Sequence, residues 1–215
     1  MSRVKHNIRI RFTKEGDLRF ISHHDLMRVF ERALRRADLP VAMSEGYNPR
    51  PRLSFPAPLS VGYIGRNEVA DVGLYAWLAP EEFRRRLQKE LPDELSILSA
   101  ESTRTNPNRQ PHELSYRIPL LDDHPVTEER IEEFLARHEW VITRRRGNGK
   151  SKQVEIRQFV KALRLQNGTL RMLLATGNRG TARPEEVLEA LDARRGRDYL
   201  FSSIERTHVN LPSSD

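Results

Sequence analysis

The sequence predicts an α+β protein made of two tandem ferredoxin-like βαββαβ units, each with an antiparallel sheet and two crossover helices on one face. Strand-like and helix-like patterns follow the same order in both halves. Two expected helix caps, Ser22 and Thr127, stand 105 positions apart, and Pro-Glu-Glu opens a later helix in each half at 80–82 and 184–186. The repeated order of elements therefore predicts a structural repeat.

This repeat sets the expected domain boundaries. Residues 102–112 include two prolines and no hydrophobic aliphatic or aromatic side chain, a composition typical of a linker. We therefore expect a first unit at 1–101, a linker at 102–112 and a second unit at 113–215.

The first half begins with a strand, because Ile8, Ile10 and Phe12 alternate with arginines. A turn at 14–17 leads to a second extended segment at 18–21. The later elements expected in this half are a helix capped by Ser22 and ended by Asp38 and Pro40, a short strand at 41–43, a glycine-punctuated connection at 59–67, a strand at 69–75, a helix opened by Pro80 and a closing strand that includes 95–98.

The second half repeats this order and adds a hairpin. Asn167-Gly168 is typical of a type I′ turn, because both residues tolerate a positive φ. The elements expected around it are a strand at 114–120, a helix capped by Thr127, strands at 140–143 and 154–165, a return strand at 170–175, a helix opened by Pro184 and a last strand at 203–209.

Composition excludes several classes of site. The 215 residues include no cysteine, which excludes disulfides, thiolate zinc sites and iron–sulfur clusters ligated by this chain. No apolar run approaches membrane-spanning length, and the N-terminus lacks the pattern of a signal peptide. We therefore expect a cytoplasmic protein without membrane contact, and we expect no metal and no cofactor.

The positive charge lies in two blocks. The formal net charge is +7, and lysine plus arginine outnumber aspartate plus glutamate by 12 to 6 over residues 1–60 and by 11 to 1 over 140–183. Residues 110–139 have the opposite balance, 3 to 8. Arginine dominates, and its planar guanidinium suits phosphates and base edges. A GC-rich genome would produce the same preference for arginine.

The first basic block contains a helix and a proline-rich loop. In the predicted helix an apolar stripe faces inward, and four arginines share the other face: Arg28, Arg32, Arg35 and Arg36. In the loop at 44–52, two prolines hold the chain extended and leave Tyr47, Asn48, Arg50 and Arg52 projecting. Cations that alternate with aromatic rings suit a phosphate backbone and stacked bases. A solvated helix face and a stiff turn are the plain structural alternatives.

The second basic block contains a hairpin loop with Arg144, Arg145, Arg146, Lys150 and Lys152. It resembles a phosphate-binding P-loop only superficially, since Arg144 replaces the first glycine and the loop joins two strands. We expect an exposed loop that reaches along a nucleic acid and that contributes little to folding.

The histidines offer one candidate for catalysis. His23 and His24 are adjacent at the start of the predicted helix that Ser22 caps, where either could act as a general acid or base in RNA cleavage. A capping or structural role is the alternative. No histidine or carboxylate spacing typical of a metal site is present.

Four segments resemble the radical-SAM-associated protein family, a domain of unknown function found fused to or encoded beside cobalamin-type radical SAM proteins. These are 16–37, 44–55, 58–62 and 68–72. The positions that match the family's motif are Arg19, Ser22, His23, Asp25, Arg28, Arg35, Arg36, Glu45, Gly46, Asn48, Pro49, Glu68 and Asp71. His24 stands where the family has an apolar residue and Tyr47 where phenylalanine is usual. The resemblance implies RNA and a radical SAM protein as partners.

The function predicted first is that of an RNA-binding accessory protein that presents rRNA or tRNA to a radical SAM enzyme. The residues expected to bind RNA are Arg19, Arg28, Arg32, Arg35, Arg36, Tyr47, Asn48, Arg50, Arg52, Arg144, Arg145, Arg146, Lys150 and Lys152. One alternative is a metal-independent endoribonuclease that uses His23 or His24. The other is a protein–protein adaptor for a radical SAM enzyme that makes no contact with nucleic acid. The sequence leaves the oligomeric state open.

Overall fold

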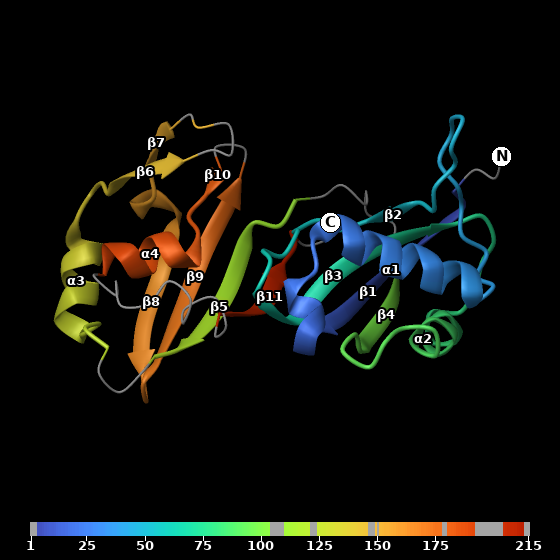
Figure 1. The fold of residues 1–215 in the computed structure, drawn as a ribbon, viewed down its shortest axis with the longest axis horizontal. Helices are drawn as coiled ribbons and strands as arrows, with labels where there is room; N and C mark the ends of the chain where they lie inside the picture. Colours follow the sequence, from blue (N-terminus) through green and yellow to red (C-terminus); the bar gives the residue numbers. More distant parts are fainter. Residues whose placement is uncertain are drawn as a thin grey trace.

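A computed structural model describes residues 4–103, 110–120, 124–145, 149, 151–177, 180–191 and 204–212. Within them the chain forms an α+β fold with one mixed sheet of nine strands and a separate two-stranded hairpin (Figure 1). The α+β class predicted from the sequence is confirmed. Two tandem ferredoxin-like units with antiparallel sheets are not evident, because strands from both halves join in the single mixed sheet.

The first half has the strand order β4-β1-β3-β2, and every pair in it is antiparallel. Its elements are β1 (His6–Lys14), α1 (His23–Arg36), β2 (Leu53–Ser54), β3 (Ile64–Leu74), α2 (Pro80–Gln88) and β4 (Ile97–Thr103). Ile8, Ile10 and Phe12 of β1 are buried with Phe30 of α1 and Phe83 of α2 in one apolar cluster. The alternation seen in the sequence therefore places the helices over one face of these strands.

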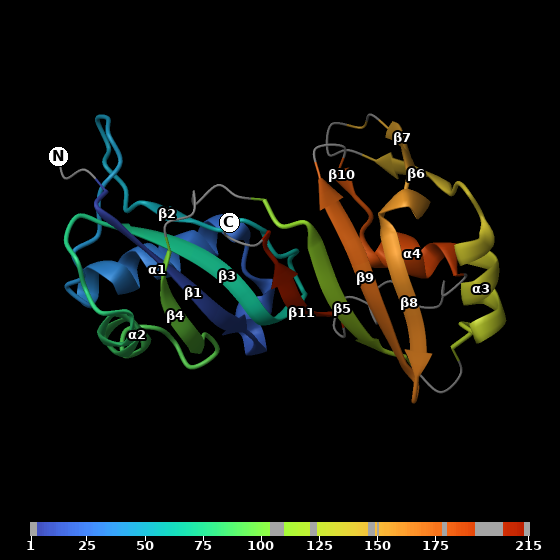
Figure 2. The same ribbon diagram turned by 180° about the vertical axis from the view of Figure 1, so that it is seen from behind.

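The second half is built differently. Its elements are β5 (Glu113–Pro119), α3 (Glu128–Ala136), β6 (Val141–Arg145), β7 (Ser151–Glu155), β8 (Val160–Gln166), β9 (Thr169–Gly177), β10 (Gly180–Thr181) and α4 (Pro184–Ala190). β9 pairs with β5 on one side and with β8 and β10 on the other, whereas β6 and β7 pair only with each other. α4 lies in front of the strands in Figure 1 and behind them in Figure 2, as α1 does.

The strand β11 (Glu205–Asn210) joins the two halves. It lies between β3 and β5, parallel to β3 and antiparallel to β5. The apolar cluster of the second half also includes Leu59, Tyr63 and Val69, which come from the first half. The domain boundaries at 1–101 and 113–215 remain a prediction, but sheet and core both cross between these ranges.

Several local predictions are confirmed. Ser22 caps α1 by accepting a hydrogen bond from the Asp25 N–H, and Thr127 caps α3 by accepting one from the Arg130 N–H. Asn167 and Gly168 have φ angles of 49° and 66°, as a type I′ turn between β8 and β9 requires.

Other local predictions are wrong. Residues 18–21 are not a strand, since Gly16–Phe20 form a 3-10 helix whose carbonyl at Arg19 accepts from the buried Lys14 amine. The strand expected at 154–165 is interrupted by a 3-10 turn at Arg157–Phe159, where the Glu155 carboxylate accepts from backbone N–H groups. Residues 64–67, expected in a connection, belong to β3.

The ends of the expected linker are ordered parts of the sheet region. Ser102 and Thr103 belong to β4, and the His112 N–H donates to the Asn210 carbonyl, 3.0 Å away. Residues 104–109 lie outside the described residues.

Candidate nucleic-acid interface

The start of α1 is held by its own polar side chains. The Ser22 hydroxyl accepts from the Asp25 N–H at 3.2 Å and donates to the Asp25 carboxylate at 2.7 Å. This hydrogen bond lowers the pKa of Asp25, and Arg28, 3.1 Å from the carboxylate, lowers it further. Three positions of the family motif thus make the helix cap, and the Arg28 side chain remains two-thirds exposed.

The arginines of α1 divide into two groups. Leu26, Phe30 and Leu34 are buried on the inner face, which leaves Arg28, Arg32 and Arg35 exposed on the outer face. Arg36 is exposed too, but its guanidinium donates to the Glu90 side chain at 2.9 Å and to the Glu90 carbonyl. Arg36 therefore ties the end of α1 to the segment after α2.

The loop 44–52 is a narrow projection from the end of the sheet (Figure 1). The Ser44 N–H donates to the Arg50 carbonyl at 2.7 Å, and the Arg50 N–H donates to the Ser44 hydroxyl at 3.0 Å. Gly46 has a φ of 122°, a conformation that favours glycine. Tyr47 is fully exposed at the tip, and Asn48, Arg50 and Arg52 are exposed as well. We call Arg28, Arg32, Arg35, Tyr47, Arg50 and Arg52 the arginine surface.

The β6–β7 hairpin differs from the expected loop. Arg144 donates to both carboxylate oxygens of Glu186 at 2.7 Å and to the Thr181 carbonyl at 3.0 Å, so it fastens the hairpin to α4. Arg145 and Lys152 are exposed, and the structure gives them no ion pair with the described residues. Arg146 and Lys150 lie outside the described residues. The prediction that this segment contributes little to folding is therefore wrong for Arg144.

Three further predicted residues lie at the 3-10 helix and the start of α1. The Arg19 guanidinium lies 4.5 Å from the centre of the Phe20 ring. His23 packs edge-on against Phe55 at 5.5 Å, and its burial, with His24 and Lys14 nearby, lowers its pKa. His24 is exposed. Burial therefore favours the neutral form of His23, which lies at the border of the apolar core.

Of the four carboxylates at motif positions, Asp25 and Glu45 are exposed, whereas Glu68 and Asp71 are buried in ion pairs. Asp71 on β3 faces Arg9 on β1, with nitrogen–oxygen distances of 2.7 and 3.0 Å. Glu68 on β3 accepts two hydrogen bonds from the Arg206 guanidinium on β11, which also donates to the carbonyls of Ala57 and Pro58. Arg9, Asp71, Glu68 and Arg206 are each at most 7% exposed. Glu68 and Asp71 therefore link β3 to β11 and β1, and removal of either would leave a buried arginine without its carboxylate.

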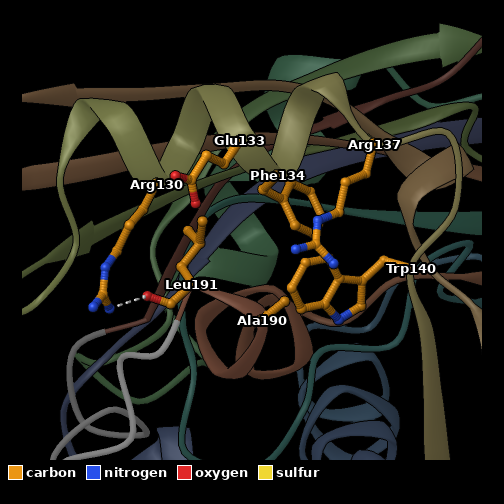
Figure 3. A pocket seen from close by; sticks show the side chains of 7 residues that line it. All are labelled: Arg130, Glu133, Phe134, Arg137, Trp140, Ala190 and Leu191. Atoms are coloured by element: carbon orange, nitrogen blue, oxygen red, sulfur yellow. Dashed lines mark hydrogen bonds between the residues drawn. The ribbon is translucent and has the colours of Figure 1, made fainter.

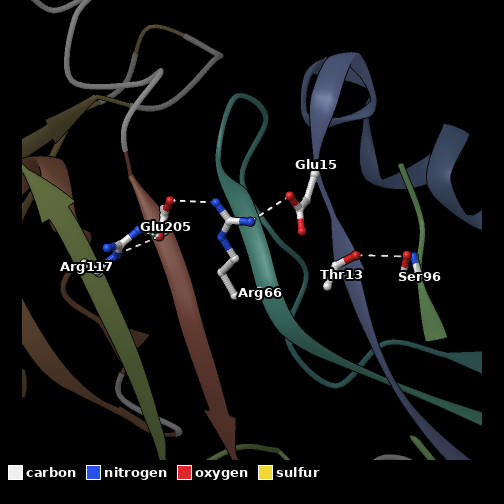
Figure 4. A network of polar contacts seen from close by, with 6 residues as sticks. All are labelled: Thr13, Glu15, Arg66, Ser96, Arg117 and Glu205. Atoms are coloured by element: carbon white, nitrogen blue, oxygen red, sulfur yellow. Dashed lines mark hydrogen bonds and ion pairs between the residues drawn. The ribbon is translucent and has the colours of Figure 1, made fainter. Parts of the chain in front are cut away.

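A second network of ion pairs crosses the sheet through Arg66 and Glu205 (Figure 4). Arg66 bridges Glu15 at 2.6 Å and Glu205 at 2.9 Å, and Glu205 also accepts from Arg117 at 2.8 Å. Burial alone would raise the pKa of Glu205, but its two arginine partners outweigh burial and lower it. We call this network, together with Glu68–Arg206, the sheet junction, because it joins β3, β11 and β5 to Glu15, the residue that follows β1.

The sequence alone did not indicate the roles of two buried arginines, Arg9 and Arg206, or the exposure of Trp77. Arg9 stands between two isoleucines of a strand and Arg206 between Glu205 and Thr207, and only their acidic partners on other strands reveal their role. Trp77, in the loop before α2, is 72% exposed, and its apolar neighbours Ala76 and Leu78 gave no signal of that exposure. Among the described residues no helix is long and apolar enough to cross a membrane, and no histidine and carboxylate group is placed to hold a metal ion.

Fold and surface define an α+β protein with a mixed sheet, a buried ionic junction and an exposed arginine surface. Residues 7–184 match the family described as "Uncharacterized protein conserved in bacteria (DUF2344)". The match spans most of the chain, so the protein belongs to this family. No curated protein matches the chain.

Proposed function

We propose that this protein binds RNA through the arginine surface. The supporting observation is the contrast among its arginines. Arg9, Arg144 and Arg206 are buried or nearly so against carboxylates, whereas Arg32, Arg35, Arg50 and Arg52 are exposed and have no ion pair with the described residues. Exposed guanidinium groups without carboxylate partners are available for phosphates.

The projecting loop adds an aromatic group to these cations. Tyr47 is fully exposed, and the hydrogen bonds between Ser44 and Arg50 hold the loop that presents it. A base stacked on such a ring contributes about 1–3 kcal/mol, whatever its sequence. The surface therefore suits single-stranded or splayed bases next to a phosphate backbone.

The sequence resemblance supports a more specific form of this proposal. In it the RNA is rRNA or tRNA, and the protein presents it to a radical SAM enzyme. The strand order β4-β1-β3-β2 and the helices α1 and α2 support describing the first half as one ferredoxin-like unit that displays α1 outward.

Charge reversal tests the proposal. A variant with Arg28, Arg35, Arg50 and Arg52 all changed to Glu should bind labelled tRNA and an rRNA fragment much more weakly, measured by fluorescence anisotropy from low to moderate salt concentration. Four lost phosphate contacts should lower the slope of log affinity against log salt by about 3.

The matched control changes four exposed cations outside the arginine surface, Lys89, Lys161, Arg164 and Arg171, to Glu. It has the same net charge as the test variant, so it should keep the salt slope and most of the affinity if the site is local. Equal losses in both variants, or unchanged binding in the test variant, would reject the arginine surface as the RNA site.

The adaptor alternative is favoured by one observation, since an exposed tyrosine on a held loop also suits a protein partner. A pull-down from nuclease-treated and untreated lysate separates the two. Recovery of ribosomal components only from the untreated lysate supports RNA binding, and nuclease-resistant capture of a radical SAM enzyme supports the adaptor.

The endoribonuclease alternative stays a prediction. Discrete RNA cuts in EDTA that vanish in His23→Ala or His24→Ala would support it.

A further inference from the structure

A groove in the second half lies between α3, α4 and β6. It consists of two pockets of about 210 and 670 Å³ that share Trp140 and Ala190 in their walls. Figure 3 shows the smaller pocket, where side chains of α3 face the end of α4. Together the two volumes are in the range of small-ligand sites.

Trp140 forms the centre of this groove. The Phe134 ring packs against it at 5.3 Å, and the Arg137 guanidinium lies 4.6 Å from its ring centre (Figure 3). A guanidinium held over an indole is oriented in advance and keeps one planar face for a ligand. This stack is an aromatic and cationic platform of the kind that nucleobases occupy.

The larger pocket supplies groups for a phosphate. Arg145 and Arg183 line it, both are exposed, and neither has a side-chain ion pair with the described residues. The carboxylate of Glu186 is occupied by Arg144 at both oxygens and by the Arg183 N–H at 2.9 Å, so little of its negative charge faces a ligand.

Two carboxylates limit the charge of the groove. Glu133 lines the smaller pocket and Glu189 the larger one, against the three available guanidinium groups of Arg137, Arg145 and Arg183. Arg130 also lines the smaller pocket, and Arg144 and Glu186 neutralise each other, so the lining residues have an excess of two positive charges. This excess suits a ligand with one or two phosphates in the groove better than a long polyanion.

We propose that this groove binds one or two nucleotides of single-stranded RNA, with a base stacked on the Arg137–Trp140 platform and a phosphate between Arg145 and Arg183. The inference rests on the proposed function and adds a second RNA site in the other half of the protein. In this arrangement Trp140 and Arg137 contact a base, and Arg145 at the end of β6 and Arg183 before α4 contact the RNA backbone.

Intrinsic fluorescence tests this site directly, because the chain has only two tryptophans. In a Trp77→Phe variant Trp140 is the single reporter, and a single-stranded oligouridylate of roughly ten nucleotides serves as the probe. We expect saturable quenching of Trp140 at the concentrations where anisotropy of labelled oligouridylate reports binding. Arg145→Ser with Arg183→Ser should weaken the quenching at least threefold.

The matched control is Trp140→Phe, in which Trp77 alone reports and quenching by oligouridylate should be lost or much smaller. Binding by anisotropy without a change in Trp140 fluorescence would overturn the groove and leave the arginine surface intact. Quenching that survives the double serine variant would also overturn it. Absence of both signals would overturn this site together with the proposed function. Circular dichroism and the melting temperature confirm that each variant is folded.

Discussion

The sheet junction and the arginine surface use the same residue in opposite ways. At the junction, Arg206 is 2% exposed and both of its donor nitrogens that face Glu68 are occupied. On α1, Arg32 and Arg35 are exposed with no ion pair to the described residues. Arginine content alone therefore says little about RNA binding, whereas pairing and burial separate structural arginines from available ones.

The difference is set by position in the secondary structure. An arginine on a central strand must share a face with residues of two neighbouring strands, so a carboxylate at the matching register can pair with it, as Asp71 does with Arg9. An arginine in the middle of an outer helix face has its nearest side-chain neighbours three or four residues away, whereas Arg36 at the end of α1 reaches Glu90. On α1 only Arg28 finds a partner at that spacing.

The largest effect should follow from breaking the junction. Glu68→Ala leaves Arg206 buried without its carboxylate, and breaking a buried ion pair costs about 3–5 kcal/mol. We expect that loss in the free energy of unfolding, measured in urea. Glu101→Ala, an exposed carboxylate on β4, is the control and should change it little. A Glu68→Ala protein as stable as the wild type would mean that the pair is not what holds β11 to β3.

A smaller loss of stability should distinguish Arg144 from its neighbour Arg145 on β6. Arg144→Ser removes three hydrogen bonds to Glu186 and Thr181, and a hydrogen bond to a charged group contributes about 1.5–3 kcal/mol. We expect a clear fall in melting temperature for Arg144→Ser and none for Arg145→Ser. Equal melting temperatures for the two variants would place Arg144 among the available arginines.

Acid should weaken the junction in a way that depends on Glu205. Because its pKa in the folded protein is lowered from the ordinary 4.5, its contribution to stability is present above pH 4.5 and is lost as the pH falls through the folded pKa. Unfolding curves between neutral pH and pH 3 should therefore show less acid destabilisation in Glu205→Gln than in the wild type. Identical pH profiles would show that this carboxyl does not couple the halves.

The smallest effect on stability should come from the arginine surface. Arg28→Ala removes one exposed contact with Asp25, and exposed pairs contribute little. We expect an unchanged melting temperature together with weaker RNA binding, measured on the same preparation. A drop in melting temperature with unchanged binding would make Arg28 a structural residue and remove the contrast with the junction.

The helix caps, the hairpin turn and the exposed face of α1 were predictable from sequence, because they depend on local contacts. Ser22, Thr127 and Asn167-Gly168 act through atoms a few residues away, so their roles follow from their immediate neighbours. The exposed face of α1 likewise follows from its apolar stripe.

The buried ion pairs, the place of β11 in the sheet and the Trp140 groove were not predictable, because each depends on residues far apart in the sequence. Arg206 and Glu68 lie 138 residues apart, and Arg144 and Glu186 lie 42 apart, so nothing near either arginine shows that it is paired. The same holds for β11, whose pattern predicts a strand but not its place between β3 and β5. The residues of the Trp140 groove also come together only in three dimensions.

The central position of β11 has a consequence for synthesis. Glu205 contacts partners 88 and 139 residues earlier in the chain, and β11 lies beyond the segment that matches the family. During translation both halves emerge before the strand that joins them, so the edges of β3 and β5 wait unpaired for several seconds at bacterial or slower elongation rates. We therefore expect the edges of β3 and β5 to stay exposed to other chains until residues 205–210 emerge and β11 pairs with both.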